Sequence, residues 1–381
     1  MDVVIAAGGA PWEEAAIREI ESSTVLRLAR RCVDVADLLA VAQTGRASGA
    51  IVSVDLPGLD VDAVSRLGSA GIVVAALASD PGRCEALGIT RVLHLAGLDD
   101  IAHEVPLRQD PVSRQAPVVA VWGPAGAPGR STVALSLAAA AAARGVDTVL
   151  VDADTYGGAL GQLLSVLDDV SGLVAACRAA NHGRAGEVVD QLIRIDPCLR
   201  LLTGLPRADM WPQVRTSSLD GVLSHLRAVT DLVVVDVGSP LEPGTGPGAA
   251  RNQTALQVVA AADLTVVVGR PDPVGLARLV RGLQDLTAVA PGGPPLVVIN
   301  QMRASLGWGE RDVRATVTRL TGTEPTVYLP ADVPGLDLAA VSGRTPREAA
   351  PSSPFVARIE VLATQVLASV VAASALAESD Q

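Results

Sequence analysis

The sequence contains no lysine, so all 30 basic residues among its 381 residues are arginines. Acidic residues number 41, which gives the chain a formal net charge of −11. A charge balance of this sign argues against a broad surface for nucleic-acid phosphates and against attraction to anionic lipid. Any site that ordinarily uses a lysine must therefore use an arginine or do without the cation.

Aromatic residues are also scarce, at 2% of the chain, although 49% of all residues are hydrophobic. The cores must therefore consist of Ala, Val and Leu, which suits parallel sheets covered by helices. The cysteines include no C-x-x-C pair, which argues against a zinc or iron–sulfur site and favours reduced structural thiols in a cytosolic protein. These four cysteines are Cys32, Cys84, Cys177 and Cys198.

Signals for export and membrane insertion are weak. The first fifteen residues contain no basic region followed by a long apolar core, so we predict no secretory signal. An uncharged stretch at residues 361–377 is at the lower end of the roughly 17–25 residues that span a bilayer. Alanine dominates it and polar residues interrupt it, so we interpret it as a final helix that packs on a sheet. We expect a cytoplasmic protein.

Short runs of Val, Ile and Leu alternate with segments of helical period, which is the pattern of βαβ units in a parallel sheet. A first series comprises residues 3–6, 25–28, 50–54, 72–76 and 91–95; a second comprises residues 118–122, 148–152, 199–202, 231–236, 264–268, 296–300 and 326–329. A polar stretch with several prolines separates the two series. We therefore predict an α/β protein with domains at residues 1–103 and 117–381 and a linker at 104–116.

A loop rich in Gly and Pro follows the first run of the second series and leads directly into a helical segment, over residues 123–132. A strand, such a loop, a hydroxyl pair and a helix together direct backbone N–H groups at a phosphate. The loop departs from the pattern G-x-x-x-x-G-K-[ST] at Pro124, which replaces the first Gly, and at Arg130, which replaces the Lys. A plain turn between strand and helix is the alternative.

Polar residues at the ends of later strands favour the phosphate loop over the plain turn. Asp152 and Asp154 end one apolar run, and Asp236 ends another, where P-loop proteins hold a Mg²⁺-bound water. Asn300 ends a third run, where an amide can pair with an adenine edge, and a proline-containing loop at residues 330–332 follows a fourth. Strands often end in Asp or Asn, but this order and spacing together indicate a nucleotide site.

On these residues, the chain from about residue 117 onward resembles the MinD/ParA group of deviant Walker ATPases. Within that group it is similar to the CpaE/TadZ branch, which includes actinobacterial septum-site-determining proteins. The group carries K-G-G-x-G-K-[ST]-T in its phosphate loop, which aligns with residues 125–132 here. The closing segment at residues 337–346 is also similar to that branch. The resemblance implies a MinD-like P-loop NTPase domain with a mostly parallel sheet.

The resemblance also implies roles for particular residues, with ATP or ADP and Mg²⁺ as ligands. The residues that would wrap the phosphates are Gly126, Ala127, Pro128, Gly129, Arg130, Ser131 and Thr132. Ser131 would bind Mg²⁺ directly, and Asp152 and Asp236 would support it through water. Asp154 would orient the attacking water, with Arg130 as the catalytic cation. The adenine would lie against Asn300, Pro330 and Asp332.

Two departures from the family pattern concern its cations. The signature lysine, which in this family reaches across a dimer to the partner's phosphates, falls on Ala125. The loop lysine is Arg130, whose planar fork does not replace a compact ammonium in a tight cradle. Arginine still bridges phosphate oxygens. We therefore expect nucleotide binding to persist while hydrolysis is slow or absent.

The first domain, residues 1–103, resembles a response-regulator receiver, a flavodoxin-like fold, in its five-strand rhythm. A working receiver needs an acidic pair after its first strand, a phosphorylated Asp after its third and a Lys after its fifth. Residues 6–9 supply no acid, the acceptor position falls on Ser53, and Asp55 is out of register. We interpret the domain as a pseudo-receiver that serves docking or dimerisation.

Two classes of function remain open at this stage. One is a nucleotide-controlled regulator whose ATP-bound homodimer recruits pilus-assembly or septum and cell-division machinery; the other is a static scaffold that does not hydrolyse ATP. A ParA-like DNA-segregation ATPase fits less well, because an acidic chain without lysine lacks a surface for DNA phosphates. A metabolic ligase of the same superfamily needs a substrate pocket that the sequence does not identify. The acidic end at residues 375–381 favours membrane contact only through a partner, at the inner face.

Overall fold

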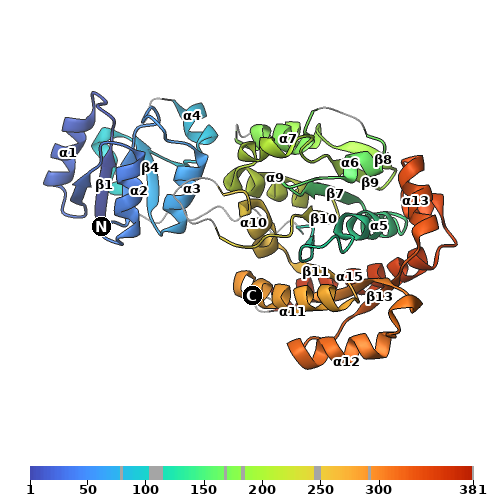
Figure 1. Cartoon of the computed structure of the whole chain (residues 1–381). Helices are drawn as coiled ribbons and strands as arrows, with labels where there is room; N and C mark the ends of the chain where they lie inside the picture. Colours follow the sequence, from blue (N-terminus) through green and yellow to red (C-terminus); the bar gives the residue numbers. More distant parts are fainter. Residues whose placement is uncertain are drawn as a thin grey trace. The chain divides into compact units, whose positions relative to one another are not determined.

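A computed structural model describes residues 1–77, 80–102, 115–166, 170–181, 185–243, 250–290 and 293–379 (Figure 1). The chain divides into two compact units. One comprises Met1–Val112 with Arg178–Ala185, and the other comprises Ser113–Cys177 with Gly186–Gln381. The predicted linker at residues 104–116 lies outside the described residues, except for its last two positions.

The first unit contains a five-stranded parallel sheet of order β2-β1-β3-β4-β5, which is the flavodoxin-like order of doubly wound folds. Its strands are β1 (Asp2–Ala6), β2 (Arg27–Arg31), β3 (Gly49–Val52), β4 (Val73–Leu77) and β5 (Arg91–Leu93). Its helices are α1 (Glu13–Ser22), α2 (Val35–Gln43), α3 (Val61–Ser69), α4 (Pro81–Ala86) and the 3₁₀ segment η1 (Leu95–Ala102). Both faces of the sheet are buried, because Val3 and Ile5 belong to one core cluster while Val4 and Ala6 belong to another.

The second unit contains an eight-stranded sheet of order β13-β12-β11-β6-β10-β7-β9-β8. Every pairing is parallel except that of β8 with β9. The strands are β6 (Val118–Trp122), β7 (Thr148–Ala153), β8 (Ile193–Asp196), β9 (Leu199–Leu202), β10 (Leu232–Val237), β11 (Leu264–Gly269), β12 (Leu296–Met302) and β13 (Val327–Pro330). The mostly parallel sheet that the apolar runs predict is confirmed.

Helices cover this sheet and join its strands. The longer ones are α5 (Arg130–Ala142), α7 (Gly172–Asn181), α9 (Thr216–Ala228), α10 (Gln253–Ala261), α11 (Pro273–Val289), α12 (Glu310–Thr321), α13 (Val333–Ser342) and α15 (Pro354–Ser379). The short ones are α6 (Leu160–Leu163), α8 (Ala185–Val189), α14 (Pro346–Ala349), η2 (Ala208–Gln213) and η3 (Ala304–Leu306).

Two strands depart furthest from the sequence prediction. Strand β8 carries no continuous apolar run, because it is an edge strand whose residues are only partly buried, and the pattern missed it. Strand β2 lies at residues 27–31 instead of 25–28. It is an arginine-rich edge strand that pairs only with β1, so an apolar run does not mark its position.

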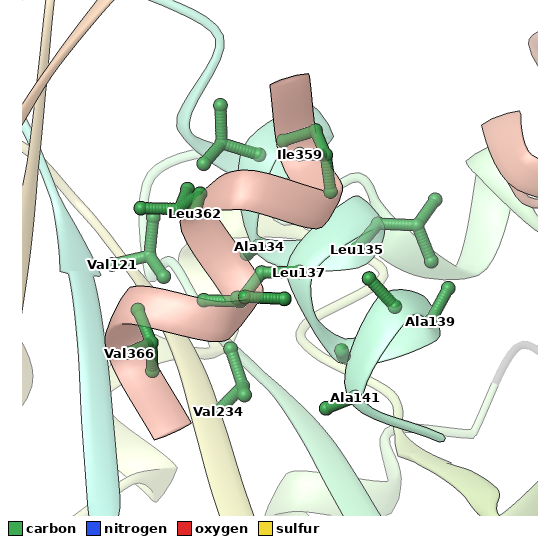
Figure 2. Close-up of a cluster of buried hydrophobic side chains, with 14 of the residues drawn as sticks. Val121, Ala134, Leu135, Leu137, Ala139, Ala141, Val234, Ile359, Leu362 and Val366 are labelled. Atoms are coloured by element: carbon green, nitrogen blue, oxygen red, sulfur yellow. The ribbon is translucent and has the colours of Figure 1, made fainter. Parts of the chain in front are cut away.

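Helix α15 packs beside α5 against the strands that carry the site (Figure 2). Ile359, Leu362 and Val366 of α15 lie in one buried cluster with Val121 of β6 and Val234 of β10. The small side chains of the alanine-rich α5 let the longer helix approach closely. The expectation of a final helix packed on the sheet is confirmed.

The same helix is the one described segment that is long and apolar enough to cross a membrane, over Pro354–Ala372. The helix is apolar because it is part of the core: its most deeply buried side chains belong to the cluster shared with α5 and the sheet. Val361, on the outer side, is 43% exposed.

Candidate functional site

The phosphate loop lies in the middle of the second sheet, where β6 is flanked by β10 and β11. Strands β7, β8 and β9, which precede β10 in the chain, extend the sheet on one side of β6. Strands β11, β12 and β13, which follow β10, extend it on the other side. Ligands of open α/β sheets bind at such a switch point, outside the carboxyl ends of the strands. The loop at residues 123–129 follows β6 at this edge, and α5 begins at Arg130.

Four side chains bind consecutive carbonyl groups of the loop: one directly follows β11, one lies in α11 and two lie in β12. Arg278 and Arg270 donate to the carbonyls of Ala125 and Gly126, each at 3.2 Å. Gln301 donates to the carbonyl of Ala127 at 3.1 Å, and Asn300 donates to that of Pro128 at 2.8 Å. The carbonyl side of the loop is thus fixed from outside.

The N–H side of the same loop is unbound. Among the hydrogen bonds of the described residues, none is donated by a backbone N–H of residues 125–132. The loop reaches this arrangement through left-handed backbone at Gly126, Ala127 and Gly129, with φ of 117°, 53° and 90°. Held carbonyls and free N–H groups before a helix N-terminus form a concave site for an anion.

Gly129 is required for this geometry. Its φ of +90° disfavours any L side chain, and an added Cβ would lie 2.5 Å from the Asn300 amide nitrogen. Asn300, 4% exposed, needs this space, because its Nδ2 reaches the loop while its Oδ1 accepts a hydrogen bond from the Gln301 N–H at 2.8 Å.

Arg130 binds the start of its own loop and a carboxylate. Its Nη1 donates to the Gly123 carbonyl at 3.2 Å, and its Nη2 lies 3.3 Å from Asp154 Oδ2. The side chains of both partners are largely buried, at 16% and 8% exposure. The cation of the loop is therefore paired with the carboxylate to which the resemblance to MinD/ParA proteins assigns the attacking water.

The two carboxylates at the end of β7 differ in their surroundings. Asp154 accepts a hydrogen bond from the Tyr156 N–H at 2.8 Å. Asp152 is 1% exposed and accepts from the N–H groups of Leu160, at 3.0 Å, and Asp154, at 3.3 Å. Burial raises the pKa of Asp152 to about 7, and these backbone bonds offset only part of the effect.

Asp236 is fully buried on β10, directly between Val121 of β6 and Asp152 of β7 in the strand register. Neither of its carboxylate oxygens has a hydrogen-bond partner among the described residues. Burial, with the charge of Asp152, raises its pKa well above the usual range, while the nearby Ser131 hydroxyl and Arg130 guanidinium act in the opposite direction. A buried carboxylate without a hydrogen-bond partner in the surrounding protein is suited to a cation or a cation-bound water.

The donor set fits Mg²⁺ held together with a phosphate. No group of three or more His, Cys, Asp and Glu forms a metal cage in the part of the chain that the structure describes. Mg²⁺ needs no such cage, because it binds through one or two carboxylates, waters and substrate phosphates. Asp236, Asp152 and the Ser131 hydroxyl supply those protein groups beside the free N–H groups of the loop.

The predicted adenine residues have other partners in this structure. Asn300 holds the phosphate loop, as described above. Asp332 caps α13 by accepting from the Gly335 N–H at 3.2 Å, and it also accepts from the Ser353 hydroxyl. Pro330 ends β13. Their contact with adenine remains a prediction.

Sequence reasoning missed Arg270, Arg278 and Gln301. Arg270 and Gln301 had a usable signal, because each lies at or just after the carboxyl end of a parallel strand. Arg278 had none, since it lies within an ordinary helix and reaches the loop only because β11 is next to β6.

Together these elements define an α/β fold with a glycine- and proline-rich loop and buried carboxylates at one edge of a mostly parallel sheet. No protein-family model matches the sequence, and no curated protein matches it at a significant level. Solved structures with the same fold are ATPases of the ParA and MinD kind. A ParA family ATPase from Chlorobium tepidum is 16% identical, with a TM-score of 0.55 over 66% of this chain and 99% of its own.

Two MinD structures are similar to the same extent. The septum site-determining protein MinD from Pyrococcus horikoshii, complexed with Mg-ADP, is 18% identical, with a TM-score of 0.52 over 66% of this chain and 96% of its own. The MinC:MinD cell division protein complex from Aquifex aeolicus gives 16% identity and a TM-score of 0.53 over 66% and 96%. At this identity the likeness establishes a shared fold.

Proposed function

We propose that this chain is an ATP-binding spatial regulator of the MinD/ParA type, with weak or no ATP hydrolysis. The observation that carries the proposal is the unpartnered, fully buried Asp236 carboxylate beside a loop whose N–H groups are free. A carboxylate without a ligand and donors without an acceptor complement a Mg²⁺ ion and a phosphate chain. The MinD of similar fold that is complexed with Mg-ADP supports the choice of ligand.

The residues divide the binding among them. The loop N–H groups of residues 125–132 would bind phosphate oxygens. Ser131 would hold Mg²⁺ directly and Asp152 and Asp236 would hold it through water, and the ion would neutralise phosphate charge. Asp154 holds the water that would attack the terminal phosphate. Asn300 keeps the loop in its binding conformation through the Pro128 carbonyl.

Slow ATP hydrolysis follows from the contacts that Arg130 makes within the protein. Its guanidinium pairs with Asp154 and donates to Gly123, so both the loop cation and the water-orienting carboxylate are engaged with each other. Hydrolysis requires this pair to separate, and nucleotide binding to the loop N–H groups does not.

The finer assignment is to the CpaE/TadZ branch, in which an ATP-bound homodimer localises pilus-assembly or septum machinery. The loop and closing segment of the sequence support it, as does the fold shared with a MinD that forms a complex with the cell division protein MinC. Partner proteins would then bring the chain to the inner face of the membrane. A static, non-hydrolysing scaffold is the second candidate, favoured by the Arg130–Asp154 pair.

Calorimetric titration with Mg-ATP and Mg-ADP tests the proposal. We expect both nucleotides to bind, and Asp236→Asn to remove the dependence on Mg²⁺, because the amide cannot neutralise a divalent cation. Asp220→Asn is the matched control, since Asp220 is a half-buried carboxylate that bonds Gln257 away from the loop. The absence of heat at millimolar nucleotide contradicts the proposed function.

Light scattering separates the two candidates. The regulator forms a dimer with Mg-ATP and not with Mg-ADP, whereas the static scaffold keeps one oligomeric state in both. We infer that the dimer, where it forms, carries the activity that recruits the partner.

For the first unit we propose a pseudo-receiver, which rests on the residues at the carboxyl edge of its sheet. Ser53 follows β3 directly, is 5% exposed, and accepts a hydrogen bond from the Asp55 N–H at 3.2 Å. Asp55 is turned outward, with a side chain 81% exposed and paired to Arg83 at 3.4 Å.

Acetyl phosphate is therefore expected to leave the mass of the intact protein unchanged, because the acceptor position carries a hydroxyl and the chain has no lysine to assist transfer. Mass spectrometry of the intact chain decides this, with a functional receiver treated in parallel. A gain of one phosphoryl group that maps to Asp55 would overturn the assignment.

A further inference from the structure

Arg278 is an exposed residue of α11 that lies over the tip of the phosphate loop. Its Nη1 donates to the Ala125 carbonyl at 3.2 Å. The guanidinium also covers the Cα of Gly126, where an added Cβ would be 2.2 Å from Nη1. The backbone at this position, with φ of +117°, favours glycine, and the absence of a side chain lets the guanidinium lie against the loop.

The charge of Arg278 is not neutralised. Among the described residues no carboxylate forms an ion pair with it, whereas Arg130 pairs with Asp154 and Arg270 pairs with Asp272. In a chain with more acidic than basic residues, an unpaired guanidinium beside an anion-binding loop marks a place for an anionic ligand.

Two cavities meet at this side chain. The smaller, about 70 Å³, is lined by loop residues 124–126 and by Arg270, Asp272 and Arg278. The larger, about 390 Å³, is lined by Ala125 and Arg278 together with Tyr156 and Ser239, which follow β7 and β10. The larger cavity therefore lies over the carboxyl edge of the strands that carry the carboxylates, and its volume is in the range of small-ligand sites.

Other charges line the larger cavity without pairing with Arg278. Arg281 is one helical turn further along α11, and Glu242 and Asp285 contribute carboxylates. Of these, Arg278 alone bonds to the phosphate loop, through the Ala125 carbonyl. Arg278 is therefore hydrogen-bonded to the loop and has no carboxylate partner among the described residues.

We propose that Arg278 binds the terminal phosphate of a nucleoside triphosphate in the larger cavity and so distinguishes the triphosphate from the diphosphate. This inference rests on the proposed nucleotide-binding function. A planar guanidinium suits two oxygens of one phosphate, and Arg278 has donors left after its bond to Ala125. The inner phosphates, bound by the loop N–H groups, need no contact with it.

Calorimetric titration of Arg278→Gln with Mg-ADP and with the non-hydrolysable Mg-AMPPNP tests the inference. We expect affinity for AMPPNP to fall about 10- to 100-fold and affinity for ADP to change by less than about threefold, because only the triphosphate loses a charged hydrogen bond. Arg319→Gln is the control, because Arg319 is exposed on α12 and lines neither cavity, and it should leave both affinities within about twofold of wild type.

A thermal melt of each variant checks folding, which an exposed arginine is not expected to affect. Equal losses for AMPPNP and ADP, no loss in Arg278→Gln, or an equal loss in Arg319→Gln would each overturn the role of Arg278. If the wild-type chain binds neither nucleotide, the proposed function fails and this inference fails with it. Nucleotide binding that is indifferent to Arg278 leaves the proposed function intact.

Discussion

Arg130→Lys is expected to raise the rate of ATP hydrolysis by about 100-fold. One well-placed donor to the transition state is worth about 100- to 1,000-fold in rate. In the native chain the guanidinium of Arg130 is held by Asp154 and the Gly123 carbonyl instead. A lysine ammonium is compact and has rotatable donors, so it reaches phosphate oxygens without bridging to both of those groups. Release of phosphate, followed in real time, measures the rate.

Asp154→Ala is the companion variant. We expect it to abolish the remaining hydrolysis, because the water loses its orienting carboxylate. ATP binding should not weaken, since Arg130 loses its intramolecular partner and becomes available to phosphate. Arg319→Lys, on the exposed side of α12, controls for introducing a lysine into a chain that has none. Brisk hydrolysis by the wild-type protein, or activity that is indifferent to Asp154→Ala, would show that the assigned roles are wrong.

Leu362→Ala is expected to lower the free energy of unfolding of the second unit by about 2–5 kcal/mol. The side chain is fully buried in α15, in the cluster that joins this helix to α5, β6 and β10. Truncation removes apolar contacts and leaves a cavity that close-packed neighbours fill only in part. Urea denaturation measures the change through tryptophan fluorescence, to which Trp122, buried on β6, contributes together with the three other tryptophans of the chain.

Val361→Ala is the matched control, because it removes methyl groups from the neighbouring residue on the outer side of the same helix. Val361 is 43% exposed, so the change should stay within about 0.5 kcal/mol. If instead Val361→Ala destabilised the protein more than Leu362→Ala, the packing of α15 on the sheet would be contradicted, and the apolar character of this helix would need another cause.

The sequence by itself determined the local elements and the edge at which they meet. Alternation of apolar runs with helical segments predicted a parallel sheet, and the Gly- and Pro-rich stretch predicted a loop between β6 and α5. Because the carboxyl ends of parallel strands share one edge, Asp152, Asp236 and Asn300 were expected at one nucleotide site. The structure brings Asp236 beside Asp152, whereas Asn300, which was assigned to the adenine, binds the loop carbonyl of Pro128. The pattern missed β8, an edge strand that is only partly buried.

Only the tertiary structure decided which side chains touch the loop. Arg278 and Arg270 are about 150 residues from the loop carbonyls that they bind, and their contact depends on β11 pairing with β6. Strand order is a property of the assembled sheet, so no local pattern contains it. Arg130 likewise pairs with Asp154 only because the sheet brings the end of β7 close to the end of β6, on the other side of β10. The sequence shows which charged residues are present and how they are spaced. It does not show which of them pair, because an ion pair forms only where the assembled fold brings two groups together.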